Sequence, residues 1–281
     1  MRQYFLRRVT NAVVMGLCVL SLVVALIPLV SVLWLVISHG ISGLSWSFFT
    51  ALPSPVGEPG GGVGNAILGT FYIVGLACLM GLPFGIGAGV FLAERGDGPF
   101  GQAVRFIAEV LSGVPSIVIG VVAYGLVVVP MKRFSALAGA VALAILMMPT
   151  LARTTEDLVR LVPTTLREAS LALGVAQWKT SLRVVLKTAL GGILTGVLLA
   201  VSRAAGETAP LLFTSLNNQY WSPGWNQPIA TLPVMIYTYA ISPYADLHRQ
   251  AWAAGFVLLA LVLGVNVTAR SIIASGMHKA R

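Results

Sequence analysis

Two ionisable residues, Arg203 and Glu207, lie within the apolar segment Leu190–Phe213. Ionisable groups at membrane depth are costly, and they usually face a water-filled cavity or a partner. A spacing of four residues places both side chains on one helix face, where they can pair. We interpret them either as a structural ion pair that ties helices together or as an anion-interacting pair on a permeation pathway. In the second case Arg203 attracts the anion, and Glu207 positions or neutralises it.

Two serines, Ser112 and Ser116, flank Pro115 within the apolar segment Phe106–Val129. An interrupted membrane helix frees backbone groups that can line a pathway. The serine hydroxyls could then bond to a passing oxyanion, although a bond to a carbonyl of the same helix is the commoner arrangement. At the start of this segment Arg105 precedes Glu109 by four residues, so we expect an ion pair at the helix end.

A third group of residues lies in the polar segment 153–187. Thr165 and Glu168 match a capping box, which predicts the start of a short helix, and Gly174 is suitably placed to end it. The helix would carry one apolar face, formed by Leu166, Ala169 and Leu173. Such a helix either lies on the bilayer surface or docks onto a cytoplasmic partner.

Helices that cross a bilayer must position these side chains. The chain of 281 residues is 57% hydrophobic and only 10% charged, whereas a soluble domain carries about 25% charged residues. This composition excludes a soluble enzyme, a disordered chain and a nucleic-acid-binding domain. A helix needs about 20 apolar residues to span the hydrocarbon core. We predict an all-α polytopic membrane protein with six transmembrane helices: Ala12–Ile37, Ala66–Leu92, Phe106–Val129, Ala136–Leu151, Leu190–Phe213 and Trp252–Ala269.

The basic residues indicate the orientation of these spans. If the N-terminus is cytoplasmic, 14 of the 18 Lys and Arg residues lie on the cytoplasmic side, as the positive-inside rule expects. They are Arg2, Arg7, Arg8, Arg95, Arg105, Arg153, Arg160, Arg167, Lys179, Arg183, Lys187, Arg270, Lys279 and Arg281. The net charge of +9 is therefore mainly a topology signal. It predicts a multi-pass protein of the inner (plasma) membrane with both termini in the cytoplasm.

Other patterns concern packing and not chemistry. The first apolar segment is too long for a signal peptide and has no nearby cleavage site, so we expect an uncleaved helix. Gly81, Gly85 and Gly89 form a stripe of small residues that favours close helix packing. Cys18 and Cys78 lack the spacing of a metal or redox site. We predict no catalytic residue, no metal site and no ATP-binding segment in this chain.

Several segments resemble the permease subunits of binding-protein-dependent ABC importers. Glu168-Ala-Ser-Leu-Ala-Leu-Gly174 is similar to their E-A-A…G coupling loop, with Ser170 in the third position. Three further segments are more specifically similar to the PstA family of phosphate permeases, within a resemblance that covers roughly Gly64–Arg270. They are Gly113–Val118, Met148–Glu156 and Arg203–Phe213.

The resemblance implies a type I ABC importer permease fold in three parts. Residues 1–63 would form an N-terminal transmembrane helix and a periplasmic loop, residues 64–273 the transmembrane core, and residues 274–281 a cytoplasmic tail. Residues Glu168, Ala169, Ser170 and Gly174 would couple to the ATPase. A substrate pathway would include Arg203, Glu207, Ser112 and Ser116.

The resemblance also implies a function and a set of partners. The chain would be the permease subunit of an ATP-driven phosphate importer, forming half of the translocation pathway. Its partners would be a homologous permease, PstC, a PstB ATPase dimer that uses the ATP, and a periplasmic or lipid-anchored phosphate-binding protein, PstS. The alternatives are an ABC permease for another oxyanion (sulfate, molybdate or phosphonate) and an ATPase-independent secondary anion transporter.

Overall fold

The computed structural model of the protein describes residues 2–55, 60–222 and 224–279, and all regular secondary structure in these residues is helical. Five helical stretches are long and apolar enough to cross a membrane: Gln3–Ile41, Gly64–Arg95, Ala136–Arg160, Gln177–Ala205 and Ala245–Ile272. A bent pair of helices, Pro99–Gly113 and Ser116–Met131, qualifies as a sixth span if it is counted as one. The predicted all-α polytopic membrane fold is confirmed.

The third predicted span is not one straight helix. Helix α4 (Pro99–Gly113) ends at Val114, whose ψ of 130° is extended, and helix α5 (Ser116–Ala123) begins after Pro115. The two parts meet at an angle of 108°. Proline lacks a backbone N–H and disfavours helical geometry in the residue before it, which explains the break. Beyond α5, a π-helical turn, η1 (Tyr124–Val128), leads into α6 (Val129–Met131).

The fifth predicted span also differs in its bounds. It begins with α9 (Gln177–Thr180) and a π-helical turn, η2 (Ser181–Val185), and continues as α10 (Leu186–Ala205). The helix stops at Gly206, and a separate short helix, α11 (Ala209–Leu212), carries Pro210 in its first turn. The expectation of one helix through Phe213 is therefore wrong, because Pro210 cannot donate the hydrogen bond that would continue α10.

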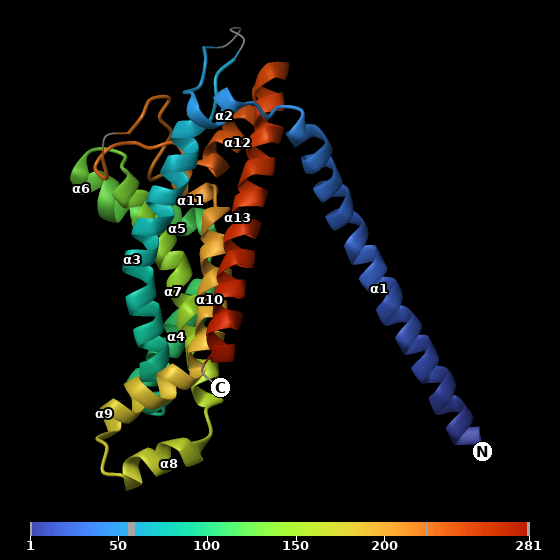
Figure 1. Ribbon diagram of the computed structural model, residues 1–281, viewed down its shortest axis with the longest axis vertical. Helices are drawn as coiled ribbons and strands as arrows, with labels where there is room; N and C mark the ends of the chain where they lie inside the picture. The colour runs from blue at the N-terminus through green and yellow to red at the C-terminus, as the bar shows by residue number, and fades with distance from the viewer. Residues whose placement is uncertain (1, 56–59, 223, 280–281) are drawn as a thin grey trace.

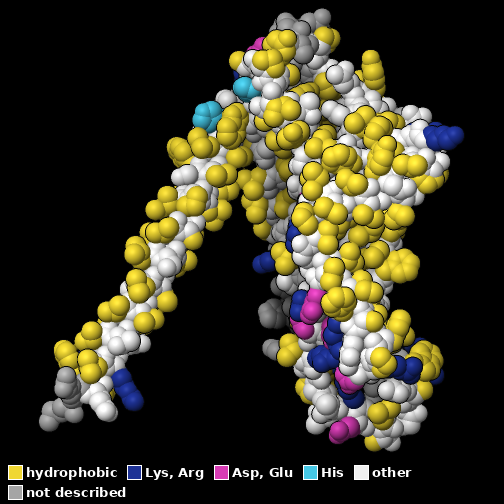
Figure 2. All heavy atoms as spheres, turned by 180° about the vertical axis from the view of Figure 1, so that it is seen from behind, with side chains coloured by type: hydrophobic (Ala, Val, Ile, Leu, Met, Phe, Trp, Pro, Cys, Tyr) yellow, Lys and Arg dark blue, Asp and Glu magenta, His cyan; other side chains and the backbone are white. Residues whose placement is uncertain are grey.

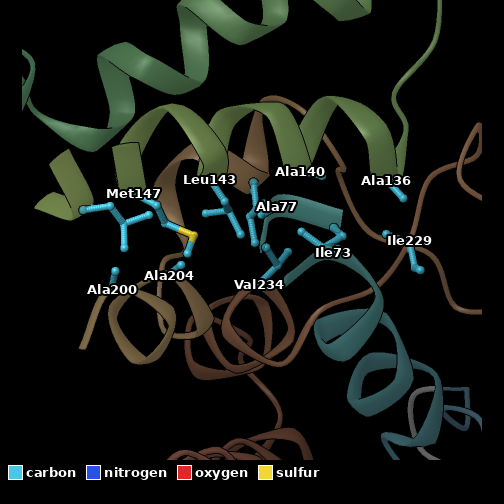
Figure 3. Close-up of a cluster of buried hydrophobic side chains, with 12 residues drawn as sticks. Ile73, Ala77, Ala136, Ala140, Leu143, Met147, Ala200, Ala204, Ile229 and Val234 are labelled. Carbon is cyan, nitrogen blue, oxygen red and sulfur yellow. The ribbon is translucent and has the colours of Figure 1, made fainter. Parts of the chain in front are cut away.

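The centre of the bundle is the contact between α3 (Gly64–Arg95) and α7 (Ala136–Arg160) (Figure 1). The predicted glycine stripe forms this contact: Gly81 faces Ala144, and a Cβ added at Gly89 would lie 2.5 Å from the Ala152 carbonyl oxygen. Small residues thus let the two backbones approach closely. Apolar side chains from α3, α7, α10 and the segment 229–234 fill the surrounding core (Figure 3).

Helices α12 (Leu232–Ala240) and α13 (Ala245–Lys279) complete the bundle. The N-terminal helix α1 (Arg2–Ile41) leans away from it and meets α13 only near its own end (Figure 1). There the rings of His39 and Trp252 lie 5.4 Å apart. The short helix α2 (Trp46–Thr50) connects α1 to α3. The boundary at residue 63 predicted from sequence falls directly before α3.

Candidate functional site

The predicted pairing of Arg203 with Glu207 is confirmed, but its geometry is not that of two residues on one helix. Arg203 lies in the last turn of α10, and Glu207 lies two residues beyond the end of that helix. The Arg203 Nε atom is 3.6 Å from Glu207 Oε1. The arginine side chain is 65% exposed and the glutamate side chain 18%. A cation in the last turn of a helix also interacts favourably with the helix dipole.

The Arg203 guanidinium remains available to a ligand. Glu207 approaches only its Nε atom, and no hydrogen bond from its two terminal nitrogens is found among the residues that the structure describes. Those two nitrogens form the planar fork with which arginine binds an oxyanion. The pair therefore combines an exposed guanidinium with a more buried carboxylate that offsets its charge.

An amide on α13 supports this part of α10. The Asn266 Nδ2 atom donates to the Ser202 Oγ atom at 2.6 Å, and Ser202 in turn donates to the Leu198 carbonyl oxygen. Ser202 directly precedes Arg203, so this bond ties the turn that carries the arginine to α13. Asn266 was not among the residues predicted from the sequence, although an amide inside the apolar span Trp252–Ala269 was the available signal.

The two predicted pathway serines lie at the break between α4 and α5. Ser112 is exposed, and its hydroxyl donates to the Ala108 carbonyl oxygen at 2.8 Å, which is the commoner arrangement expected from the sequence. Ser116 is the first residue of α5. Among the described residues, neither serine is hydrogen-bonded to Arg203 or Glu207. However, α5 packs on α11, and a Cβ added at Gly120 would lie 2.6 Å from the Pro210 Cα.

The predicted loop helix exists as α8 (Thr164–Ala172), at the far end of the bundle beyond α9 (Figure 1). The capping-box prediction is wrong: the N-cap is Pro163, two residues before Thr165, and it provides no side-chain cap. Glu168 and Ala169 are exposed, whereas Ser170 is buried. Gly174 follows the helix with a φ of +76°, a conformation that favours glycine.

The position of α8 is determined by polar contacts with three other elements. Arg167 forms an ion pair with Glu94 at the end of α3 and donates to the Val159 carbonyl oxygen of α7 at 2.9 Å. The second Glu94 oxygen accepts a hydrogen bond from Ser181 of η2 at 2.9 Å. The buried hydroxyls of Ser170 and Thr180 lie 2.9 Å apart and join α8 to α9. The sequence analysis did not identify Glu94, which joins α3 to both α8 and η2.

A second ionic cluster joins α4 to α7. Arg105 lies 2.8 Å from Glu156, and Glu109 lies 3.1 Å from Arg153. The predicted pair between Arg105 and Glu109 is therefore wrong, because each residue finds its partner on the neighbouring helix. Figure 2 shows charged side chains gathered at the end of the bundle that carries α8 and α9. Among the described residues, no three His, Cys, Asp or Glu side chains are grouped as a metal site.

Comparison with known proteins reveals full-length relatives. Residues 85–275 match the family described as "Binding-protein-dependent transport system inner membrane component". The chain is 43% identical over 273 residues to the phosphate transport system permease protein PstA of Yersinia pestis, which covers 97% of this chain and 92% of that protein. It is 44% identical to PstA of Haemophilus influenzae, with 95% of each covered, and 38% identical to PstA 1 of Mycobacterium tuberculosis H37Rv, with 95% and 88% covered.

A solved structure has a similar fold. A chain from the inward-facing MetNI methionine ABC transporter superimposes with a TM-score of 0.62 at 21% identity. The superposition covers 75% of this chain and 94% of that one. At this level of identity the likeness shows the fold, which is that of a type I ABC importer permease.

Proposed function

Because this chain belongs to the family of binding-protein-dependent transport system inner membrane components, and within it to the PstA phosphate permeases, we propose that it carries phosphate across the membrane as the permease subunit of an ATP-driven importer. The chain is a multi-pass transport subunit and not an enzyme. The observation that carries the assignment to phosphate is the 43–44% identity with named phosphate permeases over nearly the full chain.

An ABC importer permease operates with an ATPase and a substrate-binding protein. In the proposed complex these are a PstB dimer, which uses the ATP, and PstS, with PstC as the second permease that completes the pathway. The protein lies in the inner membrane with both termini in the cytoplasm, as the distribution of basic residues favours. Residues 64–273 form its transport core, preceded by the helix and periplasmic loop of residues 1–63 and followed by the tail 274–281.

Arg203 is the proposed phosphate-attracting group of the pathway. Phosphate carries one or two negative charges at neutral pH, and the exposed fork of this arginine suits its oxygens. Glu207 holds the arginine when no anion is present, and its own charge opposes tight retention of the anion. Ser112 and Ser116 would add hydroxyl donors once the break between α4 and α5 opens toward the pathway.

The exposed side of α8 is the proposed ATPase-docking surface. Of the four coupling residues, Glu168, Ala169 and Gly174 would face the ATPase, and the buried Ser170 would hold α8 against α9 through Thr180. The apolar side of α8 is only partly covered within the described part of this chain: Leu166 is 42% exposed, and Leu173, directly after the helix, is 84% exposed. A helix lying on the bilayer was the other interpretation, but α8 lies at the far end of the bundle beyond α9 (Figure 1), which favours docking onto a protein. Movement of α8 would reach α3 through Arg167 and Glu94.

The test of this function is phosphate uptake by cells in which Arg203→Gln replaces the natural permease. Loss of the guanidinium should lower uptake at least tenfold, because the amide supplies no charge for the anion, while the ATPase still co-purifies. Arg249→Gln is the matched control, since Arg249 also pairs with a nearby acid, Asp246 at 2.9 Å, but lies at the end of the bundle opposite α8. Wild-type uptake by Arg203→Gln would refute the pathway role.

The same assay separates phosphate from the other oxyanions. Excess sulfate, molybdate or phosphonate should leave the uptake of labelled phosphate unchanged. Strong competition by one of them would instead assign that anion as the substrate. Uptake that persists without an ATP-hydrolysing partner would indicate a secondary transporter.

A further inference from the structure

An apolar groove that the transport function does not use runs along one end of α3. It lies between the second half of α3 and the elements α9, η2 and the start of α10, and its volume is about 800 Å³. Its walls are mostly aliphatic and aromatic, and they include Leu82, Ile86, Val90, Phe91, Leu182 and Leu186. The groove therefore offers an apolar ligand a continuous surface at the end of the bundle near α8.

The groove reaches the boundary between the hydrocarbon core and water. The apolar run of α3 ends at Leu92 and is followed by Glu94 and Arg95, both of which line the groove. Trp178, at the same end of the groove, is 60% exposed. Tryptophan is enriched at the level of the lipid head groups. The charged end of the groove thus lies where lipid head groups are expected.

The mouth of the groove is positively charged. Arg95 and Lys179 are exposed, and neither forms an ion pair among the described residues. Arg95 lines the groove, and Lys179 lies beside it: the Lys179 Nζ atom is 5.3 Å from the centroid of the ring of Trp178, which is a wall residue. Glu94 does not neutralise them, because its two oxygens already bind Arg167 and Ser181.

We propose that this groove binds one anionic phospholipid of the cytoplasmic leaflet. An acyl chain lies along the apolar wall between α3 and η2, and the phosphate of the head group is held by Arg95 and Lys179. A packed helix from a partner subunit could fill the apolar part, but it would match the two cations only if it also placed a carboxylate beside them, whereas every anionic phospholipid carries a phosphate at that depth. Charge complementarity therefore favours the lipid. The proposal is independent of which substrate the permease carries.

Two glycines on α3 allow a matched test. A Cβ added at either Gly87 or Gly75 meets no atom within 4 Å, so both positions accept a larger side chain without a clash. Gly87 lines the groove, and Gly75 does not. Gly87→Phe should fill the groove, and Gly75→Phe should leave it open. A double variant, Arg95→Gln with Lys179→Gln, removes the charges at the mouth and leaves the groove apolar.

The experiment measures lipid binding to the whole transporter complex. The purified complex is delipidated and titrated with dioleoyl phosphatidylglycerol or dioleoyl phosphatidylethanolamine, and bound lipid is counted by native mass spectrometry. We expect one tightly bound phosphatidylglycerol per copy of this chain in the wild type and in Gly75→Phe, and its loss in Gly87→Phe. The double variant should bind phosphatidylglycerol at least fivefold more weakly, with little change for phosphatidylethanolamine.

Three results would overturn the proposal. Equal binding of phosphatidylglycerol by Gly87→Phe and Gly75→Phe would place the lipid elsewhere. Equal affinity of the wild type for the two lipids would show that the groove does not recognise the charge of the head group. Efficient disulfide cross-linking of Gly87→Cys to a cysteine on the partner permease would show that protein occupies the groove.

Discussion

At the scale of single residues, the Glu207 carboxylate limits how strongly the exposed Arg203 guanidinium of the proposed pathway can bind an anion. Glu207 approaches Arg203 from one side only, at 3.6 Å, and leaves the terminal nitrogens of the guanidinium free. A pair this exposed contributes little to stability, about 0–1 kcal/mol. We therefore assign the Arg203–Glu207 pair a role in ligand exchange, because the carboxylate competes with the incoming anion for the same cation.

The variant Glu207→Gln tests this competition. Removal of the carboxylate should strengthen anion binding by no more than the pair contributes, which corresponds to a two- to fivefold lower apparent KM for phosphate. The maximal uptake rate should fall, because release of the anion becomes slower. Initial uptake rates over a range of phosphate concentrations provide both values. A higher KM would contradict the role of Glu207 as a competitor and favour direct contact with phosphate.

Glu94 is the second residue whose charge we expect to matter for transport, because it links α8 to the membrane helices. Its side chain is 12% exposed and joins α8 and η2 to α3. Glu94→Gln should leave Arg167 without its ionic partner and weaken the mechanical link between α8 and the membrane helices. We expect phosphate-stimulated ATPase activity of the reconstituted complex to fall several-fold, while the subunits remain associated.

Asp97→Asn is the control for Glu94, because Asp97 lies near the same end of the bundle, is 99% exposed and makes only a 3.7 Å pair with Arg160. It should have wild-type activity. Partial recovery in the swapped pair Glu94→Arg with Arg167→Glu would identify the ion pair as the cause. Normal coupling in Glu94→Gln would show that the other contacts of α8 are sufficient.

At the scale of elements, close packing of α3 on α7 determines how the bundle is assembled. A Cβ added at Gly85 would lie 2.7 Å from the Leu151 Cβ, and one added at Gly89 would lie 2.5 Å from the Ala152 carbonyl oxygen, so a side chain at either position must displace part of α7. Gly192 and Gly196 of α10 likewise allow close packing of that helix on Leu158 and Thr154 of α7. Both α3 and α10 thus pack on helix α7.

Gly89→Ala tests this packing. The added Cβ would lie 2.5 Å from the Ala152 carbonyl oxygen and from the Thr155 Cβ, and overpacking of this kind costs roughly 1–3 kcal/mol. We expect a lower Tm for the detergent-purified complex. Gly75→Ala, on the same helix but in open space, should leave the Tm unchanged or raise it slightly, since alanine favours helix. Equal Tm values for both variants would refute the close contact.

At the scale of the whole molecule, the charged end and the apolar body specify how the protein sits in a membrane. The ion pairs that join α3, α4, α7 and α8 all lie at one end of the bundle, together with most of the basic residues. Helix α1 presents apolar side chains along its whole length (Figure 2), so lipid or another subunit must cover it.

Cysteine labelling in intact cells tests this orientation. After Cys18→Ala and Cys78→Ala remove the native thiols, Pro55→Cys should react with a membrane-impermeant maleimide from outside. Asp97→Cys should react only after the membrane is permeabilised, because the proposed topology places it in the cytoplasm. Both positions are exposed in the structure, so labelling of both from the same side would overturn the topology.

The sequence by itself determined the class of this protein, the approximate position of its apolar spans, and the pairing of Arg203 with Glu207. These properties are local. Hydropathy over about 20 residues decides whether a helix can span a bilayer. A spacing of four residues brings Arg203 and Glu207 within reach of each other, and, unlike Arg105 and Glu109, neither forms an ion pair with another helix among the described residues. For the same reason the short helix around Glu168 could be predicted, although its first residue could not.

Only the tertiary structure decided which charges meet between helices and how sharply the interrupted span bends. Arg105 pairs with Glu156 across 51 residues of sequence and not with its close neighbour Glu109, and Glu94 pairs with Arg167 across 73. Pro115 was visible in the sequence, but whether it bends a span or divides it depends on the helices packed around it. Periodicity contains no information about contacts between distant segments, because those contacts exist only after the helices have packed.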